Sequence, residues 1–492
     1  MGYVLGVDIG TASSKAVLTT VDGRVVARAS RSHSTAFPRP GWAEHDAESL
    51  WWADFCALTA EILAGTPHRP DAVCISGIGP CVLPTDHAGT PLRQAILYGI
   101  DTRAVEIGAQ IQDDLGGADA VLAKCGSVIS TQAAGPKLAW IREHEPQVWA
   151  DTRRFFMAHN YIVHRLTGAY VLDHQSASQC VPLYDLRDQT WDFDIAEKIA
   201  PGVELPVLAW PAQIAGEITA EAASLTGLAV GTPVGVGTID AWAEAESVDV
   251  RAPGDLMLMY GSTMFFVCVT PRVVLLPALW STQGNHPGQR TLAAGMASSG
   301  SITEWFRTLT GVQDFGELVT AAEHSRPGGN GLLALPYFSG ERTPVADPDA
   351  RGVIIGLTLT HSRADIYRAL LEATAFGVRH NLSAFADAGA KPTRVVAVGG
   401  GTARRLWPQI VSDITGYAQD VPTERVGACF GDARFAALAL GAVEPDRSWN
   451  TTETRLAPNP TTTALYDELY DAYLQLAEAT TAIQHSLAKH QR

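Results

Sequence analysis

Residues 6–18 read Gly-Val-Asp-Ile-Gly-Thr-Ala-Ser-Ser-Lys-Ala-Val-Leu, so a carboxylate, a glycine and several hydroxyl groups stand between two apolar runs. Residues 3–7 predict a buried strand, and residues 16–20 predict the strand that returns beside it. Gly10 permits a tight turn whose backbone N–H groups can face an anion, and Asp8 at the strand end can hold Mg²⁺ through water. The turn adds hydroxyl donors and one positive charge: Thr11, Ser13, Ser14 and Lys15. The stretch predicts a cradle for phosphate and metal, with an ordinary hairpin as the alternative.

The composition is that of a globular protein with more than one domain. The 492 residues exceed what one hydrophobic core usually holds, and length alone predicts two or three domains. Hydrophobic residues make up 46% of the chain and charged residues 18%, which excludes a disordered protein. The net charge of −16 argues against binding to nucleic acid or to an anionic membrane surface, because both require basic stripes.

Cysteine usage and hydropathy indicate the cell compartment. The seven cysteines are odd in number and scattered, and no Cys-x-x-Cys pair occurs. Neither a disulfide framework nor a zinc site is expected, and a reducing cytoplasm is the predicted location. No apolar run reaches about 18 residues and no charged leader precedes the first strand, so we expect neither secretion nor a membrane span.

The first half of the chain alternates strands and helices. Asp22-Gly23 lies between two β-rich runs in residues 17–29, which is a strong hairpin signal. Apolar residues recur at helical spacing over residues 47–64, and residues 72–76 predict a short buried strand that ends in a glycine-rich turn. Residues 100–200 mix helical patterns with polar loops, and we expect them to form an insertion that lines a cleft. This order predicts an α/β domain.

The second half repeats the plan of the first. Residues 256–260 and 265–269 are β-rich and flank the turn Gly261-Ser262-Thr263, as the opening strands flank their own Gly-x-Thr turn. A duplicated nucleotide-binding unit would place one phosphate-facing turn from each half across a cleft. We therefore predict two domains, residues 1–244 and 245–492.

Three further patterns follow in the second half. Ser362 and Asp365 form a capping-box pattern that opens a long helix through residue 386. Residues 394–398 predict a strand, Gly399-Gly400-Gly401 a turn and residues 406–414 a helix, an order that suggests contact with a ligand. A Pro/Thr-rich stretch, residues 447–462, predicts a loop before a closing amphipathic helix.

A second carboxylate, Asp240, follows a Val/Gly-rich run that predicts the end of a strand. Beside a phosphate cradle, a carboxylate at this position could accept the proton of an attacking hydroxyl. The alternative is that Asp240 caps the helix predicted over residues 241–247. The residues alone leave both interpretations open.

Several motifs resemble the FGGY carbohydrate kinases, a family of the actin-like ATPase superfamily. The most specific is Leu335-Pro-Tyr-Phe-Ser-Gly-Glu-Arg-Thr-Pro344, which Asp347-Pro-x-Ala-Arg-Gly352 follows, and it is most similar to the xylulokinase branch. Residues 352–372 are similar to the C-terminal signature of the family, and Gly41-Trp-x-Glu-x-Asp46 adds N-terminal support. The matches run from about residue 3 to residue 440, which is nearly the whole chain.

The resemblance implies an α/β fold in which two ribonuclease H-like domains flank a central cleft and close around ATP–Mg²⁺ and a sugar or polyol. It implies that Asp240 is the catalytic base, that Asp8 is a catalytic, metal-associated carboxylate and that Asp240 also lies at the metal. The implied nucleotide-binding positions are Gly10, Thr11 and Lys15 in one phosphate loop, Gly261, Ser262 and Thr263 in the other, Gly300 and Glu304 at a helix start, and Gly399, Gly400 and Arg404 in an adenosine-side turn.

The acceptor site departs from the family pattern. After the strand over residues 73–76, xylulokinases usually carry Gln-Met-His and glycerol kinases Arg-Glu, whereas this chain has Ile78-Gly-Pro-Cys81, and Ala241 replaces an amide. A site built for a hydroxyl loses heavily when its partner group is missing, so we expect altered substrate choice. We expect Cys81 to be a packing residue, not a nucleophile. The predicted substrate positions are Gly79, Pro80, Cys81, Asp101, Arg103, Asp240 and Trp242.

The sequence therefore predicts an ATP-dependent kinase that phosphorylates a hydroxyl of a sugar or polyol, with a ketose such as D-xylulose as the leading acceptor. A kinase for a different pentose, hexose or polyol is one alternative, and a non-catalytic sugar-binding or regulatory relative is another. A chaperone or filament ATPase of the superfamily would lack the block at residues 339–344. Dimers are common in the group that the chain resembles, so a homodimer is one expected assembly.

Overall fold

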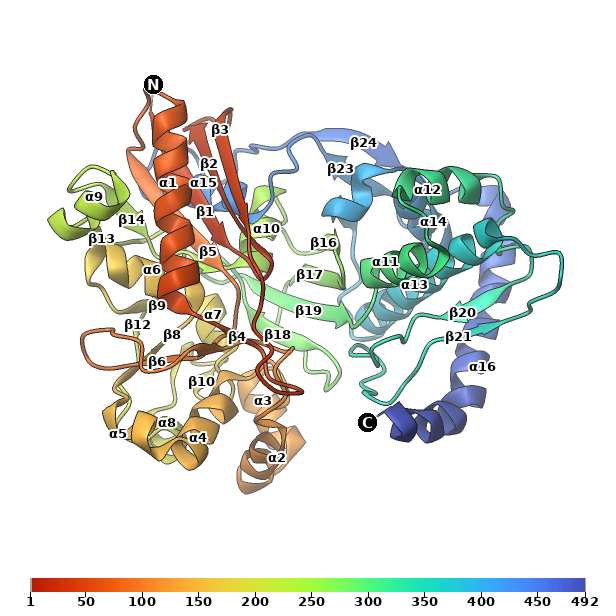
Figure 1. Cartoon of the computed structure of the whole chain (residues 1–492), viewed down its shortest axis with the longest axis horizontal. Coiled ribbons are helices and arrows are strands. Elements are labelled where there is room, and N and C mark those ends of the chain that lie inside the picture. Colours follow the sequence, from red (N-terminus) through yellow and green to blue (C-terminus); the bar gives the residue numbers. More distant parts are fainter. Residues whose placement is uncertain (1, 492) are drawn as a thin grey trace.

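The computed structural model describes residues 2–491, which form two α/β halves, each built on a seven-stranded mixed sheet (Figure 1). In the first sheet the order is β13-β14-β5-β1-β2-β3, and β15 pairs with β5 outside this row. β1 runs antiparallel to β2 and parallel to β5. The strands are β1 (Tyr3–Ile9), β2 (Ser13–Thr20), β3 (Val25–Ser32), β5 (Ala72–Gly77), β13 (Ile214–Glu217), β14 (Pro233–Gly235) and β15 (Thr238–Ile239).

The second sheet repeats the core of the first. Its order is β18-β19-β17-β16-β22-β23-β24. β16 runs antiparallel to β17 and parallel to β22, just as β1 runs antiparallel to β2 and parallel to β5. The duplicated plan predicted from the sequence is therefore confirmed. The strands are β16 (Asp255–Tyr260), β17 (Met264–Thr270), β18 (Trp280–Gln283), β19 (Arg290–Met296), β22 (Arg394–Val398), β23 (Gln419–Pro422) and β24 (Thr452–Leu456).

Helices and short strands surround the first sheet and form a lobe at its lower end in Figure 1. The helix expected over residues 47–64 begins with a π-helical segment, Ala47–Trp52, and continues as α1 (Ala53–Gly65). The other helices are α2 (Val105–Asp114), α3 (Ala118–Cys125), α4 (Ala134–His144), α5 (Pro146–Asp151), α6 (Ala158–Thr167), α7 (His174–Ser178), α8 (Phe193–Ile199), α9 (Ala220–Thr226) and α10 (Asp240–Ser247). The short strands are β4 (Glu44–His45), β6 (Leu83–Thr85), β7 (Ala95–Ile96), β8 (Arg154–Phe156), β9 (Val171–Asp173), β10 (Tyr184–Asp185), β11 (Thr190–Trp191) and β12 (Val207–Ala209).

Among the described residues the second half contains six α-helices, two of which are the longest in the molecule. The six are α11 (Gly300–Thr310), α12 (Phe315–Glu323), α13 (Arg363–Asp387), α14 (Leu406–Thr415), α15 (Ala428–Ala439) and α16 (Thr463–Ala488), with 3₁₀ turns at Gly400–Ala403, Pro460–Thr462 and Lys489–Gln491 and a hairpin of β20 (Leu333–Leu335) and β21 (Val353–Ile355). No helix between residues 2 and 491 has the length and apolar character needed to cross a bilayer.

One helix of the second half lies on the first sheet. α15 packs on β1 and β5 and against α10, and Figure 1 shows it beside β1, far from the elements that precede it in the chain. The approach is so close that a Cβ on Gly6 would lie 1.9 Å from the carbonyl oxygen of Cys429, and a Cβ on Gly431 would lie 1.9 Å from that of Ala243. The first sheet is therefore completed by a segment from beyond residue 244.

An ion-pair cluster joins α10 to α15. The fully buried Glu246 of α10 pairs with the guanidinium of Arg434 on α15, and Nε2 of His286 lies 2.9 Å from its second carboxylate oxygen. Arg434 also donates to the carbonyl oxygen of Pro445 at 2.7 Å. The cluster fixes the helix that carries Asp240 to the helix that returns from the second half.

Local signals predicted several elements and missed others, two of which show why. The strand over residues 394–398, the capping box at Ser362 and the start of the last helix at Thr463 are confirmed. The loop expected over residues 447–462 is wrong in part, because it contains β24. Four of the five β24 residues are exposed, so this edge strand has no apolar alternation to reveal it. α15, the second of these two elements, is buried almost all round and has no polar face.

Candidate active site

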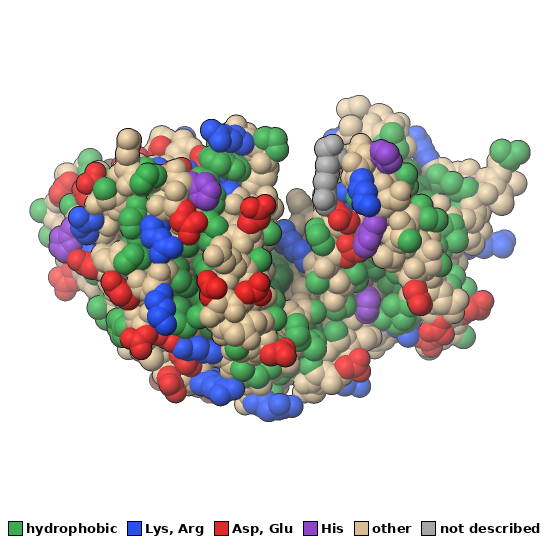
Figure 2. Space-filling model, turned by 90° about the horizontal axis from the view of Figure 1, so that it is seen from below, with side chains coloured by type: hydrophobic (Ala, Val, Ile, Leu, Met, Phe, Trp, Pro, Cys, Tyr) green, Lys and Arg blue, Asp and Glu red, His purple; other side chains and the backbone are tan. Residues whose placement is uncertain are grey.

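A cavity of about 300 Å³, which we call the central pocket, lies between the two halves. Figure 2 shows that a groove separates the two lobes at the surface. The central pocket is walled by the turns that follow β1 and β16 and by the first turn of α10. Of the predicted site residues it is lined by Asp8, Gly10, Thr11, Lys15, Gly79, Asp240, Trp242 and Thr263.

Asp8 and Asp240 reach the same edge of the first sheet because their strands lie on either side of β5. Both β1 and β15 run parallel to β5, and Asp8 and Thr238 are both in register with Ser76. Asp240 follows β15 directly, at the carboxyl ends of the parallel strands, where open α/β sheets bind their ligands. The N-cap of α10 is Ile239, so Asp240 is not the cap residue itself, but its Oδ1 accepts a hydrogen bond from the N–H of Ala241 in the first turn of that helix at 2.7 Å.

The acids of the central pocket are held in an environment that disfavours their charged forms. Burial raises the pKa of Asp8 to about 6, against the opposing charge of Lys15. Burial, together with repulsion from Asp8, raises the pKa of Asp240 to about 8. Burial also raises the pKa of Glu244 to about 7. Three neighbouring carboxyl groups with raised pKa values form a site that a cation would stabilise.

The oxygen donors of the pocket fit Mg²⁺. Oδ1 of Asp8 is buried and accepts no hydrogen bond from any described residue. Mg²⁺ prefers oxygen ligands and is usually held by one or two carboxylates together with waters and substrate phosphates. Between residues 2 and 491 no group of three or more His, Cys, Asp or Glu side chains is arranged to hold a metal. The residues therefore suit a metal that arrives with a phosphate ligand, with Asp8 and Asp240 as its protein carboxylates.

The turn that follows β1, which we call the first turn, is held in place by a hydrogen bond to His33. The turn closes through the N–H of Gly10, which donates to the carbonyl oxygen of Ser13 at 3.1 Å. Nε2 of His33 lies 3.0 Å from the carbonyl oxygen of Gly10, and Nδ1 lies 2.9 Å from Oδ2 of Asp54. Ser14 donates to the same carboxylate oxygen at 2.8 Å. This network holds the turn in a single shape, so its backbone N–H groups are oriented before any ligand arrives.

The turn that follows β16, which we call the second turn, is hydrogen-bonded to the start of α11. The N–H of Gly261 donates to the carbonyl oxygen of Thr263, and Gly300 donates to Gly261, each at 3.0 Å. A Cβ on Gly300 would lie 2.5 Å from the carbonyl oxygen of Gly261, so only glycine permits this approach. The two groups of residues predicted to contact the nucleotide, residues 261–263 and Gly300, are therefore neighbours, with Ser262 accepting from the helix start.

The remaining nucleotide-side predictions divide into two kinds. Gly399 has φ +88° and packs so closely that a Cβ there would lie 2.7 Å from the carbonyl oxygen of Tyr260, so it and Gly400 adjoin the second turn. Glu304 lies on the exposed face of α11 and pairs with Arg307 at 2.6 Å. Arg404 lies beside the start of α12, outside the central pocket. The structure brings the glycines together and leaves these two charged residues at the surface.

Most of the predicted substrate residues lie outside the central pocket. Pro80 and Cys81 are buried and do not line it, and burial raises the pKa of the Cys81 thiol, which agrees with a packing role. Arg103 is fully buried, where it pairs with Asp101 at 2.7 Å and with Glu44 at 2.8 Å. These charges hold the segment that follows β7 in place and are not free to bind a ligand.

Trp242 serves both the core and the pocket. Its Nε1 donates to Oγ1 of Thr291 at 2.9 Å, and its side chain is almost wholly buried, yet it forms part of the pocket wall beside Asp240. Trp242 therefore packs in the core and also lines the predicted site.

Several pocket residues were missed by sequence reasoning: Tyr98, Gln132, Gln179, Phe265, Trp280 and Arg342. Arg342 stands inside the motif at residues 335–344 that carries the family resemblance, so that motif was itself a usable signal. The hydroxyl of Tyr98 lies 2.8 Å from Oγ1 of Thr11, which ties this wall to the first turn. Gln179 comes from the insertion and Trp280 from the second sheet, and no local pattern distinguishes either from a core residue.

Two sheets of the same plan that face their glycine turns across a central pocket define the actin-like fold of nucleotide-dependent phosphotransferases. The sequence matches the FGGY family of carbohydrate kinases, N-terminal domain, over residues 3–245 and C-terminal domain over residues 256–440. The chain belongs to this family and is a carbohydrate kinase that phosphorylates a sugar or polyol.

Individual relatives are similar over nearly their whole length. The chain is 33% identical to glycerol kinase of Nocardia farcinica (strain IFM 10152), covering 89% of this chain and 90% of that protein. It is 29% identical to xylulose kinase of Escherichia coli (strain K12), covering 90% and 91%. The crystal structure of xylulose kinase from Rhodospirillum rubrum superimposes with a TM-score of 0.89 at 31% identity, covering 98% of this chain and all of that one.

Proposed function

We propose that this protein transfers the γ-phosphoryl group of ATP to a hydroxyl of a small ketose or polyol, with Asp240 as the base. The observation that carries the proposal is the pair of carboxylates, Asp8 and Asp240, held at one sheet edge between two braced turns. Phosphoryl transfer needs in-line positioning and charge neutralisation more than covalent help, and this arrangement supplies both.

In the proposed mechanism, the acceptor hydroxyl lies against Asp240, and its oxygen attacks the γ-phosphorus. The new O–P bond forms as the bond to the β,γ-bridging oxygen breaks, and ADP leaves with that electron pair. Asp240 takes the hydroxyl proton, which requires its ionised form. Bound Mg²⁺ supplies neutralising charge at the phosphate oxygens and favours the ionised form of both carboxylates.

The two turns hold the phosphates in this scheme. Backbone N–H groups of the first turn, with Thr11 and Lys15, would face the transferred group. Residues 261–263, of which Thr263 lines the central pocket, would face the rest of the phosphate chain from the second half. Because His33 and the start of α11 fix the turns in advance, little reorganisation is needed when charge develops.

D-Xylulose is the acceptor that we propose first, because the residues that carry the family resemblance are most similar to xylulokinases. The similarity to a glycerol kinase favours a shorter polyol as the second candidate. Neither candidate explains why the segment Ile78-Gly-Pro-Cys81 and Ala241 stand where such enzymes carry hydrogen-bonding side chains.

The test is a coupled ADP-release assay with Mg²⁺-ATP and a panel that includes D-xylulose, D-ribulose, glycerol, erythritol and D-gluconate. Acceptor-dependent release, with the phosphorylated product identified by mass spectrometry, is the expected result. ADP release that is the same with and without every acceptor would overturn the proposal. A matched reaction with EDTA in place of Mg²⁺ should show no turnover.

A further inference from the structure

A second cavity, which we call the side chamber, adjoins the central pocket. Its volume is about 500 Å³, larger than the central pocket itself. Three residues, Gln132, Trp280 and Arg342, line both cavities. A molecule whose reacting hydroxyl lies at Asp240 can therefore extend past these residues into the side chamber.

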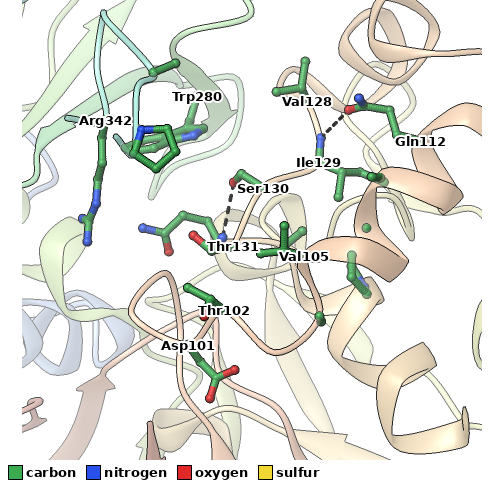
Figure 3. A pocket seen from close by; sticks show the side chains of 18 of the residues that line it. Asp101, Thr102, Val105, Gln112, Val128, Ile129, Ser130, Thr131, Trp280 and Arg342 are labelled. Carbon is green, nitrogen blue, oxygen red and sulfur yellow. Dashed lines mark hydrogen bonds between the residues drawn. The ribbon is translucent and has the colours of Figure 1, made fainter. Parts of the chain in front are cut away.

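The walls of the side chamber are mostly apolar and come from both halves of the molecule. Figure 3 shows Val105 of α2 together with Val128 and Ile129 on one side, and Trp280 on the opposite side. Its apolar lining residues include Val105, Ala109, Val128, Ile129, Pro277 and Ala278. A wall of this kind favours an apolar group over a hydroxyl-rich one.

Three polar side chains of the side chamber, those of Gln112, Lys137 and Asp101, already have partners within the protein. Gln112 accepts a hydrogen bond from the N–H of Ile129 at 3.1 Å, which Figure 3 shows as a dashed line. Lys137 donates to two backbone carbonyl oxygens of the preceding segment, at 2.6 and 3.0 Å. Asp101 is paired with Arg103. These groups therefore offer little to the hydroxyls of a sugar, because each would have to give up an existing partner.

Free polar groups lie at the other end, where the two cavities meet. Nε2 of Gln179 is buried in the wall of the central pocket and has no hydrogen-bond partner among the described residues. In residues 2–491 no hydrogen bond or ion pair is made by the guanidinium of Arg342, which Figure 3 shows at the edge of the side chamber. Polar recognition is thus concentrated near Asp240, and apolar surface lies beyond it.

We propose that the side chamber binds an apolar substituent of the acceptor, so that the preferred substrate is a sugar or polyol that carries an alkyl or aryl group at the end away from the phosphorylated hydroxyl. This inference rests on the proposed function and specifies its substrate class. It accounts for the segment Ile78-Gly-Pro-Cys81 and for Ala241, because an acceptor with fewer hydroxyls needs fewer hydrogen-bonding partners than a free sugar.

The experiment compares matched acceptors in the ADP-release assay. Glycerol, erythritol and D-xylulose are each assayed beside their mono-O-butyl and mono-O-benzyl ethers at a terminal carbon. We expect kcat/KM for the best ether to exceed that for its parent by about tenfold or more, because each buried methylene strengthens binding. Parents that react while every ether reacts more slowly would overturn the inference and leave the proposed function intact. No turnover of any parent or ether would overturn both.

Two variants fill the side chamber from opposite walls. Ala109→Trp places an indole on the exposed face of α2, and Ala278→Trp places one on the wall from the second half. In each variant the ratio of kcat/KM for the ether to that for its parent should fall about tenfold. Gln110→Trp, the next residue of α2, is also exposed but does not line the chamber, so it should keep the wild-type ratio. A ratio unchanged in both chamber variants, each shown by thermal unfolding to be folded, would overturn the inference.

Discussion

The central pocket and the side chamber adjoin, yet the wall of the first is polar and charged whereas the wall of the second is mostly apolar. The central pocket holds carboxylates with raised pKa values, a buried carboxylate oxygen without a donor and two turns of backbone N–H groups. The side chamber has mostly apolar walls, and the polar side chains of Gln112 and Lys137 in it are already hydrogen-bonded within the protein. On the proposals above, one cavity binds phosphate and metal, and the other binds an apolar group.

This difference separates two kinds of mutational effect. A change in the central pocket that weakens phosphate positioning should lower kcat for every acceptor alike. A change near the junction of the cavities should alter KM for the acceptor and leave the KM for ATP unchanged. Of the five predictions below, those for Asp240, His33 and Gln179 test that separation, and the two for Glu246 test the stability of the fold that supports it.

The largest effect is expected for Asp240→Asn, which keeps the shape of the side chain and removes the base. We expect kcat to fall about 10²- to 10⁴-fold for every acceptor, the usual contribution of general-base catalysis. ADP release measures the rate, and calorimetry should show that ATP binding persists. Asp194→Asn, a change in the exposed first turn of α8, is the matched control and should keep full activity. A loss confined to one acceptor would contradict the role of Asp240.

The next effect concerns the cluster that joins α10 to α15 beneath the central pocket. Glu246→Gln leaves Arg434 buried without its carboxylate, which should lower the free energy of unfolding by about 3–5 kcal/mol at pH 7. Chemical denaturation measures this change. Glu221→Gln, an exposed change on α9, should leave stability unaltered. Equal stability of the two variants would show that the cluster does not hold the helices together.

The same cluster predicts a pH dependence of stability. Burial alone would raise the pKa of Glu246, but the charges of His286 and Arg434 outweigh it and lower this pKa to about 2 from an ordinary value of 4.5. Because the folded-state pKa is the lower one, the stabilisation is complete above about pH 4.5 and is lost as the pH falls towards 2. Unfolding curves should therefore converge for wild type and Glu246→Gln as the pH falls through this range.

A smaller and uniform effect is expected for His33→Gln. The amide cannot bridge the carbonyl oxygen of Gly10 and the carboxylate of Asp54 as the imidazole ring does, so the first turn loses its brace. We expect kcat to fall about tenfold for every acceptor, since small displacements of positioning groups are costly. His87→Gln, on an exposed histidine, is the control. A change in acceptor preference without a change in kcat would show that His33 affects acceptor binding and not phosphate positioning.

The smallest effect is expected for Gln179→Met, which keeps the volume and removes the free amide. The KM for the acceptor should rise about 5- to 10-fold, the value of one hydrogen bond, while the KM for ATP stays constant. Initial-rate measurements with each substrate varied in turn give both constants. Gln110→Met is the control on an exposed glutamine. An equal rise in both KM values would show that Gln179 does not bind the acceptor specifically.

Short-range patterns predicted the elements that present the phosphate-facing groups. A hairpin, a glycine turn or a capping box depends on residues within a few positions of one another, so Gly10, Gly261 and Ser362 could be interpreted from their neighbours alone. The family motifs added the carboxylate at Asp240. The acceptor side could not be predicted in this way, because Gln179 and Trp280 reach the pocket only through the packing of distant segments.

The sequence by itself determined the two phosphate-facing turns and the strands beside them, since tight turns and strand patterns are set by local sterics and hydropathy. It also determined the family, through motifs at residues 335–352. Only the tertiary structure decided that α15 returns to the first sheet, that Asp101 and Arg103 neutralise one another, and that an apolar chamber adjoins the central pocket. These features depend on which surfaces meet when the two halves pack, and no local pattern carries that information.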